Sequence, residues 1–434
     1  MIDADQYSQE TPASQEARPP KHFLLIAIGS AGDVHPFVGL GQTLKRRGHQ
    51  VTIATCSYFR PLIDRVGLGF VEIIPAEEYL RMIEDPDLWH PMRGPKFVMQ
   101  NAIAPGIRRV YDIIARLYEP GRTVVAASSL AMGARVAHDK LGVPTATVHL
   151  QPIVLRSVAQ PGRLMGLFAP PWLPRSLVRA QYWLADVLVV DRLIGPELNG
   201  LRGELGLSPV RRSFDGYIHS PQLTVGLFPA WYAPHAPDWP SQTRLTGFPL
   251  YDEQDVTPLS DDVQAFLAAG PPPVVFTPGS AMTHAGPQFA AVVEACRRSG
   301  RRAVLLTRHP EQLPASLPPE VRHFDYVPFS QLLPHCAASI HHGGIGSVAQ
   351  ALVAGVPQVV MSMSHDQFDN AERLERMGVG AALPPKVFQA DRLAAMLDQL
   401  LGTPTVKTAC REIQSRFAGT TPLEDTARLL EAVN

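Results

Sequence analysis

The chain has little cysteine, little net charge and no apolar run long enough to cross a membrane. Its 434 residues include four cysteines, which stand far apart and form no CxxC pair. That spacing excludes a zinc site and a disulfide framework, so we expect four reduced core residues of a cytosolic protein. The formal net charge is -1, and charged residues make up 18% of the chain. This balance gives no field that would attract nucleic acid.

The first 21 residues are polar, contain acids, glutamines and prolines, and have no apolar segment. They predict a disordered tail and not a signal peptide. The remaining length exceeds what one hydrophobic core serves, so two domains are expected. Without a membrane-spanning run, the protein is expected in the cytoplasm, at most peripherally on the inner face of the membrane.

From residue 22 onward, apolar runs that end in glycine alternate with segments of helical spacing. The run that begins at His22 suits a buried parallel strand, Pro36–Arg47 a helix, and Gln50–Cys56 a second strand. The pattern continues to about residue 235, gives way to a proline-rich stretch, and restarts at Pro273. We predict an α/β fold in which two Rossmann-like, doubly wound parallel-sheet domains, residues 22–235 and 273–434, face a cleft, with a linker at 236–272.

Small and polar residues close the first strand, in the order Gly29, Ser30, Ala31, Gly32 and Asp33. Asp33 stands at the start of a helix, where the helix dipole keeps a carboxylate ionised. That place suits a general base at the cleft, and it equally suits a plain helix N-cap. His35 is the rival base, although a lone histidine in a first helical turn is more often a capping or surface residue.

The glycine-rich stretch that follows the strand near Ser339 is the most informative part of the chain. His342 precedes three glycines and the serine that opens the next helix: Gly343, Gly344, Gly346 and Ser347. Amides, imidazole, hydroxyl and helix dipole together favour a diphosphate. The alternative is a glycine-rich helix start with a buried histidine. Because dipole and imidazole can take the place of a cation, neither a metal nor another cofactor is expected.

Asp366 and Gln367 follow the next strand of the second half. A carboxylate beside an amide can accept from and donate to adjacent sugar hydroxyls, although the pair could also be an N-cap and its neighbour. Gly279 and Ser280 are a second, weaker phosphate contact, or only a turn.

One segment departs from the alternating plan. Leu164–Ile194 carries Phe168, Trp172 and Trp183 among many aliphatic residues and few charges. The plainer interpretation is a core helix. The alternative is a lipophilic acceptor channel or a membrane-facing patch, in which these three aromatic side chains contact the acceptor.

Together these motifs resemble the GT-B glycosyltransferases of family one, over essentially all of the chain after residue 22. The donor signature of that family, H-x-G-x-x-(S/T) followed by G-x-P and D-Q, is matched by His342, Gly343, Ser347, Gly355, Pro357, Asp366 and Gln367. The S-x-G-D turn of its bacterial branch is reproduced by Ser30, Gly32 and Asp33. The resemblance implies Asp33 as general base, an inverting, metal-independent transfer from a nucleotide sugar, and a last helix that crosses back to the first domain.

The resemblance also assigns residues to the nucleotide and the acceptor. Tyr326 lies where the family places an aromatic ring over the nucleobase, and the backbone of Val327 would read the base edge. Gln350 stands where UDP-using relatives often carry a glutamate that grips the ribose, which favours a dTDP donor. Ser128 falls near the position of the aspartate that orients the histidine of plant relatives, and it is a weaker acceptor candidate.

Segments such as GSAGDVHPFVGL and HDQFDNAERL are similar to the rhamnosyltransferases of bacterial rhamnolipid synthesis. This likeness implies transfer of L-rhamnose from dTDP-L-rhamnose to a hydroxyl of a 3-(3-hydroxyalkanoyloxy)alkanoate, giving a mono-rhamnolipid. His35 and His342 depart from that group, where an aromatic residue and a proline are expected. The expected partners are the nucleotide sugar, the lipophilic acceptor, and the membrane or an enzyme that supplies this acceptor.

Two alternatives stay open. Transfer of glucose from UDP-glucose to a sterol, carotenoid or polyketide alcohol keeps the fold and changes the substrates. A nucleotide-sugar epimerase or a non-catalytic nucleotide-sugar-binding protein changes the class. The apolar segment Leu164–Ile194 and the Asp366–Gln367 pair favour a transferase.

Overall fold

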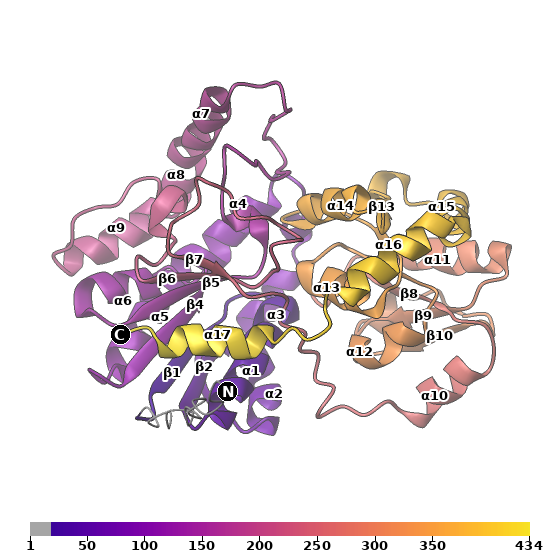
Figure 1. Cartoon of the computed structure of the whole chain (residues 1–434), viewed down its shortest axis with the longest axis horizontal. Helices are drawn as coiled ribbons and strands as arrows, with labels where there is room; N and C mark the ends of the chain where they lie inside the picture. The colour runs from indigo at the N-terminus through magenta and orange to yellow at the C-terminus, as the bar shows by residue number, and fades with distance from the viewer. Residues whose placement is uncertain (1–18) are drawn as a thin grey trace, which may run out of the picture.

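The structure is a computed structural model that describes residues 19–434, so most of the predicted tail lies outside the described residues. Two parallel sheets form its two halves (Figure 1). The first sheet contains β1 His22–Ile26, β2 Gln50–Cys56, β3 Gly69–Ile74, β4 Thr123–Ser128, β5 Thr145–His149, β6 Leu223–Gly226 and β7 Thr243–Leu245. Its strand order is β3-β2-β1-β4-β5-β6-β7.

The second sheet contains β8 Val274–Thr277, β9 Ala303–Leu306, β10 Val321–Phe324, β11 Ala338–His341, β12 Gln358–Val360 and β13 Gly380–Ala382. Its order is β10-β9-β8-β11-β12-β13. The order reverses beside β1 in the first sheet and beside β8 in the second. At such a reversal a doubly wound sheet leaves a crevice at the carboxyl ends of its strands. The turns after β1 and β8 therefore open where a ligand can bind.

Helices cover the sheets in both halves. Those of the first half are α1 Ala31–Arg46, α2 Arg60–Arg65, α3 Ala76–Glu84, α4 Gly94–Val98, α5 Ala104–Leu117, α6 Gly133–Leu141, α7 Arg175–Ala185, α8 Asp191–Leu193 and α9 Gly195–Glu204. Those that follow are α10 Asp261–Ala268, α11 Gly286–Ser299, α12 Phe329–Leu332, α13 Ile345–Ala354, α14 Gln367–Arg376, α15 Ala390–Gly402, α16 Pro404–Ser415 and α17 Pro422–Glu431.

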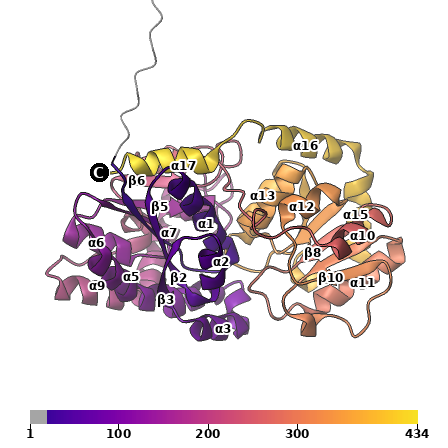
Figure 2. The same ribbon diagram turned by 90° about the horizontal axis from the view of Figure 1, so that it is seen from below.

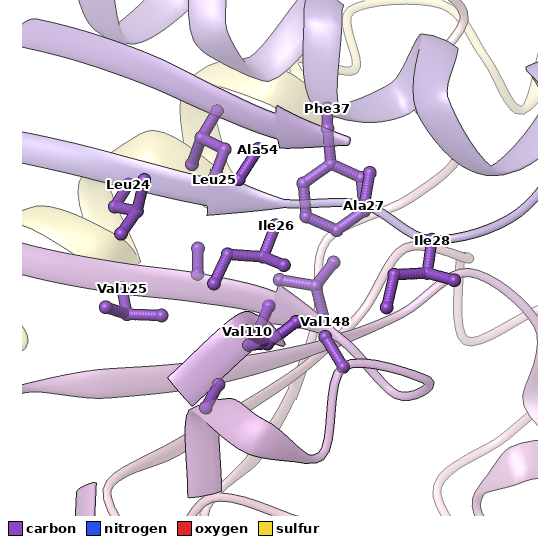
Figure 3. Close-up of a cluster of buried hydrophobic side chains, with 14 of the residues drawn as sticks. Leu24, Leu25, Ile26, Ala27, Ile28, Phe37, Ala54, Val110, Val125 and Val148 are labelled. Carbon is purple, nitrogen blue, oxygen red and sulfur yellow. The ribbon is translucent and has the colours of Figure 1, made fainter. Parts of the chain in front are cut away.

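The continuous apolar run of β1 is explained by burial on both faces of its strand. Leu24, Leu25 and Ile26 are fully buried, and they lie among side chains from neighbouring strands and from α1 and α5 (Figure 3). Phe37 of α1 and Val110 of α5 belong to the same cluster. A strand packed on both faces has no polar face to alternate with its apolar one, so its sequence reads as an unbroken apolar run.

The last helix, α17, leaves the second half and lies on the first (Figure 2). It packs against α1, and Ala427 and Leu430 are fully buried in the core of the first sheet. The Nζ of Lys21, just before β1, donates to the carbonyl oxygen of Val433 at 2.9 Å. The chain end is thus bound to the domain in which the chain begins.

The structure differs from the sequence prediction in three places. The helix expected at Pro36 begins earlier, at Ala31, so Pro36 lies inside α1, where it removes one hydrogen bond to the preceding turn. The predicted linker contains β7, a three-residue edge strand of the first sheet. The apolar segment Leu164–Ile194 contains α7, whose side chains are mostly exposed, so it is not a core helix. Among the described residues, no helix is both long and apolar enough to span a bilayer.

Candidate active site

A cavity of about 430 Å³ lies between the two sheets, at the carboxyl ends of their strands. The turns after β1 and β8 line it, together with the segments after β10, β11 and β12. Most of the residues predicted to bind donor or catalyse transfer are among its walls: Ser30, Gly32, Asp33, Gly279, Ser280, Tyr326, Val327, His342, Gly344, Gly346, Ser347, Gln350, Asp366 and Gln367.

Asp33 lies in the first turn of α1 with its carboxyl group at the cavity wall. Its Oδ2 accepts from the backbone N–H of Ser30 at 2.8 Å and from the Ser30 hydroxyl at 3.1 Å. Ser30 is the N-cap, so Asp33 is the third residue of a capping box and not the cap itself. Burial raises the pKa of Asp33 to about 6, although the Ser30 hydrogen bonds lower it in part. Such a carboxylate is ionised at neutral pH and is basic enough to accept a proton.

The imidazole of His342 is held between two glycines. A Cβ on Gly279 would lie 2.9 Å from His342 Cε1, and a Cβ on Gly344 would lie 2.5 Å from His342 Nε2. Gly279 also has a φ of +104°, which favours glycine independently. His342 Nδ1 is buried and has no hydrogen-bond partner among the described residues. Burial lowers the pKa of His342 to about 3, so the ring is neutral in this structure.

The start of α13 supplies the donors beside this ring. Gly344, the N-cap, and Gly346 and Ser347 in the first turn of the helix line the cavity. The first amides of a helix have no intrahelical partner, and the helix dipole makes their neighbourhood favourable for an anion. His342 and this first turn together form a site with the donors that a diphosphate requires.

Gly343, which is also predicted to bind the phosphates, differs from these residues because it is not among those that line the cavity. Its N–H donates to Nδ1 of the buried His341 at 3.0 Å, and its carbonyl accepts from Asn370 Nδ2 at 2.9 Å. A Cβ at this position would lie 2.6 Å from Val360. Gly343 therefore closes the turn, while its neighbours face the cavity.

Asp366 and Gln367 lie together at the start of α14. Asp366 Oδ2 accepts from Asn370 Nδ2 at 2.7 Å, and burial raises the pKa of Asp366 to about 7. The Gln367 side-chain oxygen is already engaged, because it accepts from the N–H groups of Met363 at 2.6 Å and Ser364 at 3.0 Å. Gln367 can therefore donate to a sugar hydroxyl but not accept from one, which narrows the predicted role.

The predicted nucleobase side lies at the other end of the same sheet. The Tyr326 hydroxyl donates to the carbonyl oxygen of Asp252 at 2.6 Å, and the guanidinium of Arg308 lies 5.2 Å from the Tyr326 ring centre. Gln350 is buried, and its side-chain oxygen has no partner among the described residues. A buried amide oxygen at a cavity wall is an acceptor that a bound hydroxyl can satisfy.

On the side of the first sheet the cavity wall is apolar. It is formed by residues from the end of β3 through α3 and α4 to the start of α5, and from the turns after β4 and β5: Ile74, Tyr79, Met82, Ile83, Leu88, Phe97, Val98, Ala102, Leu130 and Leu150. The predicted acceptor residues are elsewhere. Ser128 is buried at the end of β4 outside the cavity wall, and Phe168, Trp172 and Trp183 are exposed on the surface. The three aromatic residues of Leu164–Ile194 therefore do not form a channel to this cavity.

Trp89 was not predicted from the sequence and joins the two halves at the cavity. Its indole N–H donates to the carbonyl oxygen of Ala281 at 3.2 Å. Its ring meets His342 and His365 edge-on, with centroids 6.2 Å and 5.8 Å apart. The only signal in the sequence is the DPDLWHP segment, in which a tryptophan between polar and turn residues suggests an exposed anchor. In the fold this anchor covers the histidine at the predicted diphosphate site.

Comparison with known proteins shows the family to which this chain belongs. The O-mycaminosyltylonolide 6-deoxyallosyltransferase of Streptomyces fradiae is 30% identical over 424 residues, which are 94% of this chain and 96% of the relative. The chain belongs to the GT-B glycosyltransferases of family one. Two family models agree with this assignment. Residues 23–160 match the glycosyltransferase family 28 N-terminal domain, and residues 302–432 match the erythromycin biosynthesis protein CIII-like C-terminal domain.

Solved structures agree with the fold of this glycosyltransferase. The glycotransferase of kitacinnamycin has a TM-score of 0.74 at 20% identity, over 95% of this chain and 99% of its own. Glycosyltransferase VinC in complex with DTDP has a TM-score of 0.67 at 20% identity, with the same coverage. The chain is therefore a glycosyltransferase, an enzyme that transfers a sugar from a nucleotide sugar to an acceptor.

Proposed function

We propose that this glycosyltransferase moves a 6-deoxyhexosyl group from dTDP to a hydroxyl of a lipid-like acceptor, with inversion and without a metal. In its most specific form the donor is dTDP-L-rhamnose and the acceptor a 3-(3-hydroxyalkanoyloxy)alkanoate. The observation that carries the proposal is the place of Asp33. Its carboxyl group lies at a cavity that is apolar on one side and ends at the start of α13 on the other.

In the proposed reaction the acceptor hydroxyl gives its proton to Asp33 as its oxygen forms a bond to the anomeric carbon. The bond from that carbon to the β-phosphate oxygen breaks, and dTDP leaves with the electron pair. Because attack comes from the face opposite the leaving group, a single displacement inverts the anomeric centre. The neutral imidazole of His342, the amides at the start of α13 and the Ser347 hydroxyl would stabilise the charge that develops on the diphosphate.

Gln350 supports a dTDP donor. A glutamate at this position can accept from two ribose hydroxyls, whereas the single carbonyl oxygen of Gln350 suits the one free hydroxyl of a 2-deoxyribose. The DTDP complex of VinC and the 6-deoxyallosyl donor in the name of the Streptomyces fradiae relative are consistent with this choice. Asp366 and the Gln367 amide would then hold the sugar hydroxyls.

The apolar wall supports an acceptor with a large hydrocarbon part. Burial of apolar surface contributes about 25 cal/mol per Å², so this wall selects an aliphatic chain over a polar sugar or peptide. A polyketide alcohol is the second candidate acceptor, because a relative with 30% identity is named for transfer to O-mycaminosyltylonolide. A bilayer or a partner enzyme would deliver either hydrophobic acceptor.

The test is a matrix of donors and acceptors with release of nucleotide diphosphate as readout. dTDP-L-rhamnose and UDP-glucose are each combined with a hydroxyalkanoyloxyalkanoate, a sterol and a polyketide alcohol. We expect release that depends on acceptor with dTDP-L-rhamnose and the alkanoate. Greater activity with UDP-glucose would show that the proposed donor is wrong, and greater activity with the sterol or the polyketide alcohol would show that the proposed acceptor is wrong. Turnover of the donor with no acceptor requirement would contradict a transferase.

A further inference from the structure

Most of the exposed large apolar side chains gather on one segment, residues 165–188, which we call the arm. Among the described residues, seven of nine such side chains lie there: Met165, Phe168, Trp172, Leu177, Trp183, Leu184 and Leu188. Trp172 is 72% exposed and Phe168 59% exposed. In Figure 1 α7 stands out from the body of the first half. An exposed apolar patch of this kind marks an interaction surface.

The exposed side of the helix in the arm differs from the solvent-exposed side of an ordinary surface helix. Val178, Tyr182, Asp186 and Val190 are buried at a spacing of four residues, which is one narrow stripe. A surface helix normally exposes polar residues opposite such a stripe. Here the opposite side presents Leu177, Trp183 and Leu184 instead. An exposed apolar face of this kind is expected to be covered by an apolar surface of another molecule.

The arm is held in place by specific contacts. Arg156 forms an ion pair with Asp186 at 2.6 Å, and its guanidinium lies 5.3 Å from the ring centre of Tyr182. The Gln181 side chain accepts from the N–H of Phe168 at 2.9 Å and donates to the carbonyl of Phe168 at 2.8 Å. These bonds tie the loop with Phe168 to α7, so the exposed aromatic residues are presented by an anchored element.

The exposed charges of the arm are of one sign. Arg175 and Arg179 are exposed on α7, and neither forms an ion pair within the described residues. The only acid between residues 158 and 190 is Asp186, which is buried and paired with Arg156. Aromatic and aliphatic side chains beside arginines, without exposed carboxylates, complement an anionic bilayer, where aromatic rings and arginines lie at the headgroup level.

The arm adjoins the rim of the active-site cavity. A Cβ on Gly166 would lie 3.5 Å from Cε of Met92, which is 50% exposed. Met92 lies between Trp89 and Phe97, and both of these residues line the cavity. At the base of the arm, the N–H of Arg163 donates to Asp369 of α14 at 2.9 Å. Met92 therefore places an exposed apolar side chain between the arm and the segment whose Trp89 and Phe97 line the cavity.

We propose that the arm docks on the surface of an anionic lipid bilayer. Phe168, Trp172, Leu177 and Trp183 enter the headgroup boundary, and Arg175 and Arg179 contact lipid phosphates. The enzyme then lies on the membrane without spanning it. This inference rests on the proposed lipid-like acceptor, because such a molecule can pass from the leaflet to the cavity along the Met92 rim.

Binding to vesicles tests the proposal directly. The full chain is sedimented with vesicles of phosphatidylcholine alone and of phosphatidylcholine mixed with phosphatidylglycerol. We expect binding to the anionic vesicles that weakens with salt. The charge variant Arg175→Glu/Arg179→Glu should lose binding by roughly fivefold or more for each arginine. The matched variant Arg392→Glu/Arg411→Glu makes the same charge change at exposed positions of the second half and should keep wild-type binding.

A second variant separates the apolar part from the charge. Trp172→Ser/Trp183→Ser changes side chains that are at least half exposed, so folding should be retained, which circular dichroism checks. We expect loss of vesicle binding and of transfer to vesicle-borne acceptor, with transfer to a short soluble hydroxyalkanoate unchanged. Wild-type protein that stays off both kinds of vesicle overturns the docking proposal, even if it transfers the sugar.

Two further outcomes distinguish the occupant and the function. If sedimentation velocity shows a wild-type dimer that Trp172→Ser/Trp183→Ser converts to a monomer, a second copy covers the arm and the membrane proposal is wrong. If the protein binds anionic vesicles through the arm but transfers no 6-deoxyhexose to any acceptor, the docking proposal stands and the proposed function fails.

Discussion

His35 Nε2 lies 3.1 Å from Glu253 Oε1, which joins α1 to the segment between the two sheets. His35 follows the proposed base, Asp33, by two residues, so the rival base predicted from the sequence is engaged as a structural partner. The second oxygen of Glu253 accepts from Arg65 Nη2 at 2.6 Å. Glu253 is buried and has a φ of +62°, a conformation that costs a non-glycine residue free energy. The surrounding contacts must offset that strain.

The residue before Glu253 reaches the second half of the molecule. The carboxylate of Asp252 accepts from the Ser330 N–H at 2.7 Å and from the Ser330 hydroxyl at 3.1 Å. Its carbonyl oxygen accepts from the Tyr326 hydroxyl. Two adjacent residues therefore connect the helix that carries Asp33 to the wall that is predicted to hold the nucleobase.

Replacing Glu253 tests this connection. Glu253→Gln keeps the shape of the side chain and removes the charge that faces His35 and Arg65. We expect the free energy of unfolding to fall by about 1–2 kcal/mol, because Arg65 is itself half exposed and water screens part of the pair. Urea denaturation measures it. Glu424→Gln removes a more exposed partner of Arg47 and should cost less than about 0.5 kcal/mol; equal costs would contradict a special role for Glu253.

Gly344→Ala should weaken nucleotide binding. The new Cβ would overlap Nε2 of His342 and move the imidazole out of its place between the two glycines. Loss of one hydrogen bond to a charged group corresponds to about 1.5–3 kcal/mol, or a roughly tenfold to hundredfold rise in the Kd for dTDP. Isothermal titration measures it. Gly402→Ala adds the same methyl group in open space and should bind dTDP as wild type does.

Much of the fold could be predicted because glycine and proline residues mark the ends of many helices and strands in the sequence. β2 was predicted as Gln50–Cys56 and is found there, since an apolar run between a glycine turn and a helix leaves little choice. β7 was missed because three residues at a sheet edge carry no periodicity. The core helix expected within Leu164–Ile194 was wrong for another reason. An apolar stripe in a sequence gives the amount of apolar surface, but only the tertiary structure shows which part of it is covered.

The sequence predicted which strand ends carry the residues of the site, but it did not predict the hydrogen bonds that these residues make. Glycine at 343 and at 344 looks alike in a sequence, yet Gly343 donates to His341 while Gly344 lines the cavity. Gln367 likewise gave no sign that its oxygen bonds to the N–H groups just before it. Trp89 contributes from a distant part of the chain, and no local pattern reports such a contact. These features depend on which groups meet across the cleft.

Asp33→Asn should lower turnover by about a hundredfold or more and leave dTDP binding nearly unchanged. An asparagine oxygen can still accept from Ser30, so the start of α1 should be preserved. Because burial raises the pKa of Asp33 to about 6, wild-type kcat/KM should fall about tenfold per unit as the pH drops below that value. The residual activity of the variant should lack this acidic limb. A variant with normal turnover would exclude Asp33 as the base.

Asp366→Asn should change how stability depends on pH. Burial raises the pKa of Asp366 to about 7, above its unfolded value, so its protonated form favours folding and this contribution is lost as the pH rises through about 7. Asparagine keeps an oxygen for Asn370 and carries no charge. Relative to wild type, the variant should therefore gain about 2–3 kcal/mol between about pH 5 and pH 8. The exposed Asp391→Asn should gain nothing measurable over that range; the same result for both would contradict the raised pKa.

Gln350→Glu tests the choice of nucleotide. In the wild type one buried amide oxygen without a partner faces a cavity in which the ribose is proposed to lie. A carboxylate offers a second acceptor, and a hydrogen bond from a hydroxyl to a charged group contributes about 1.5–3 kcal/mol, so a ribose with both hydroxyls should gain more than a 2-deoxyribose. We expect the ratio of kcat/KM for the UDP-sugar to that for the dTDP-sugar to rise by about tenfold or more.

Steady-state kinetics with both donors and one acceptor measures this ratio. The control Gln350→Ala removes the oxygen altogether, so it should weaken the binding of both donors without shifting the ratio in favour of UDP. If the glutamate variant leaves the ratio where it was, position 350 does not read the sugar of the nucleotide, and the preference for dTDP must come from contacts to the base at Tyr326 and Val327.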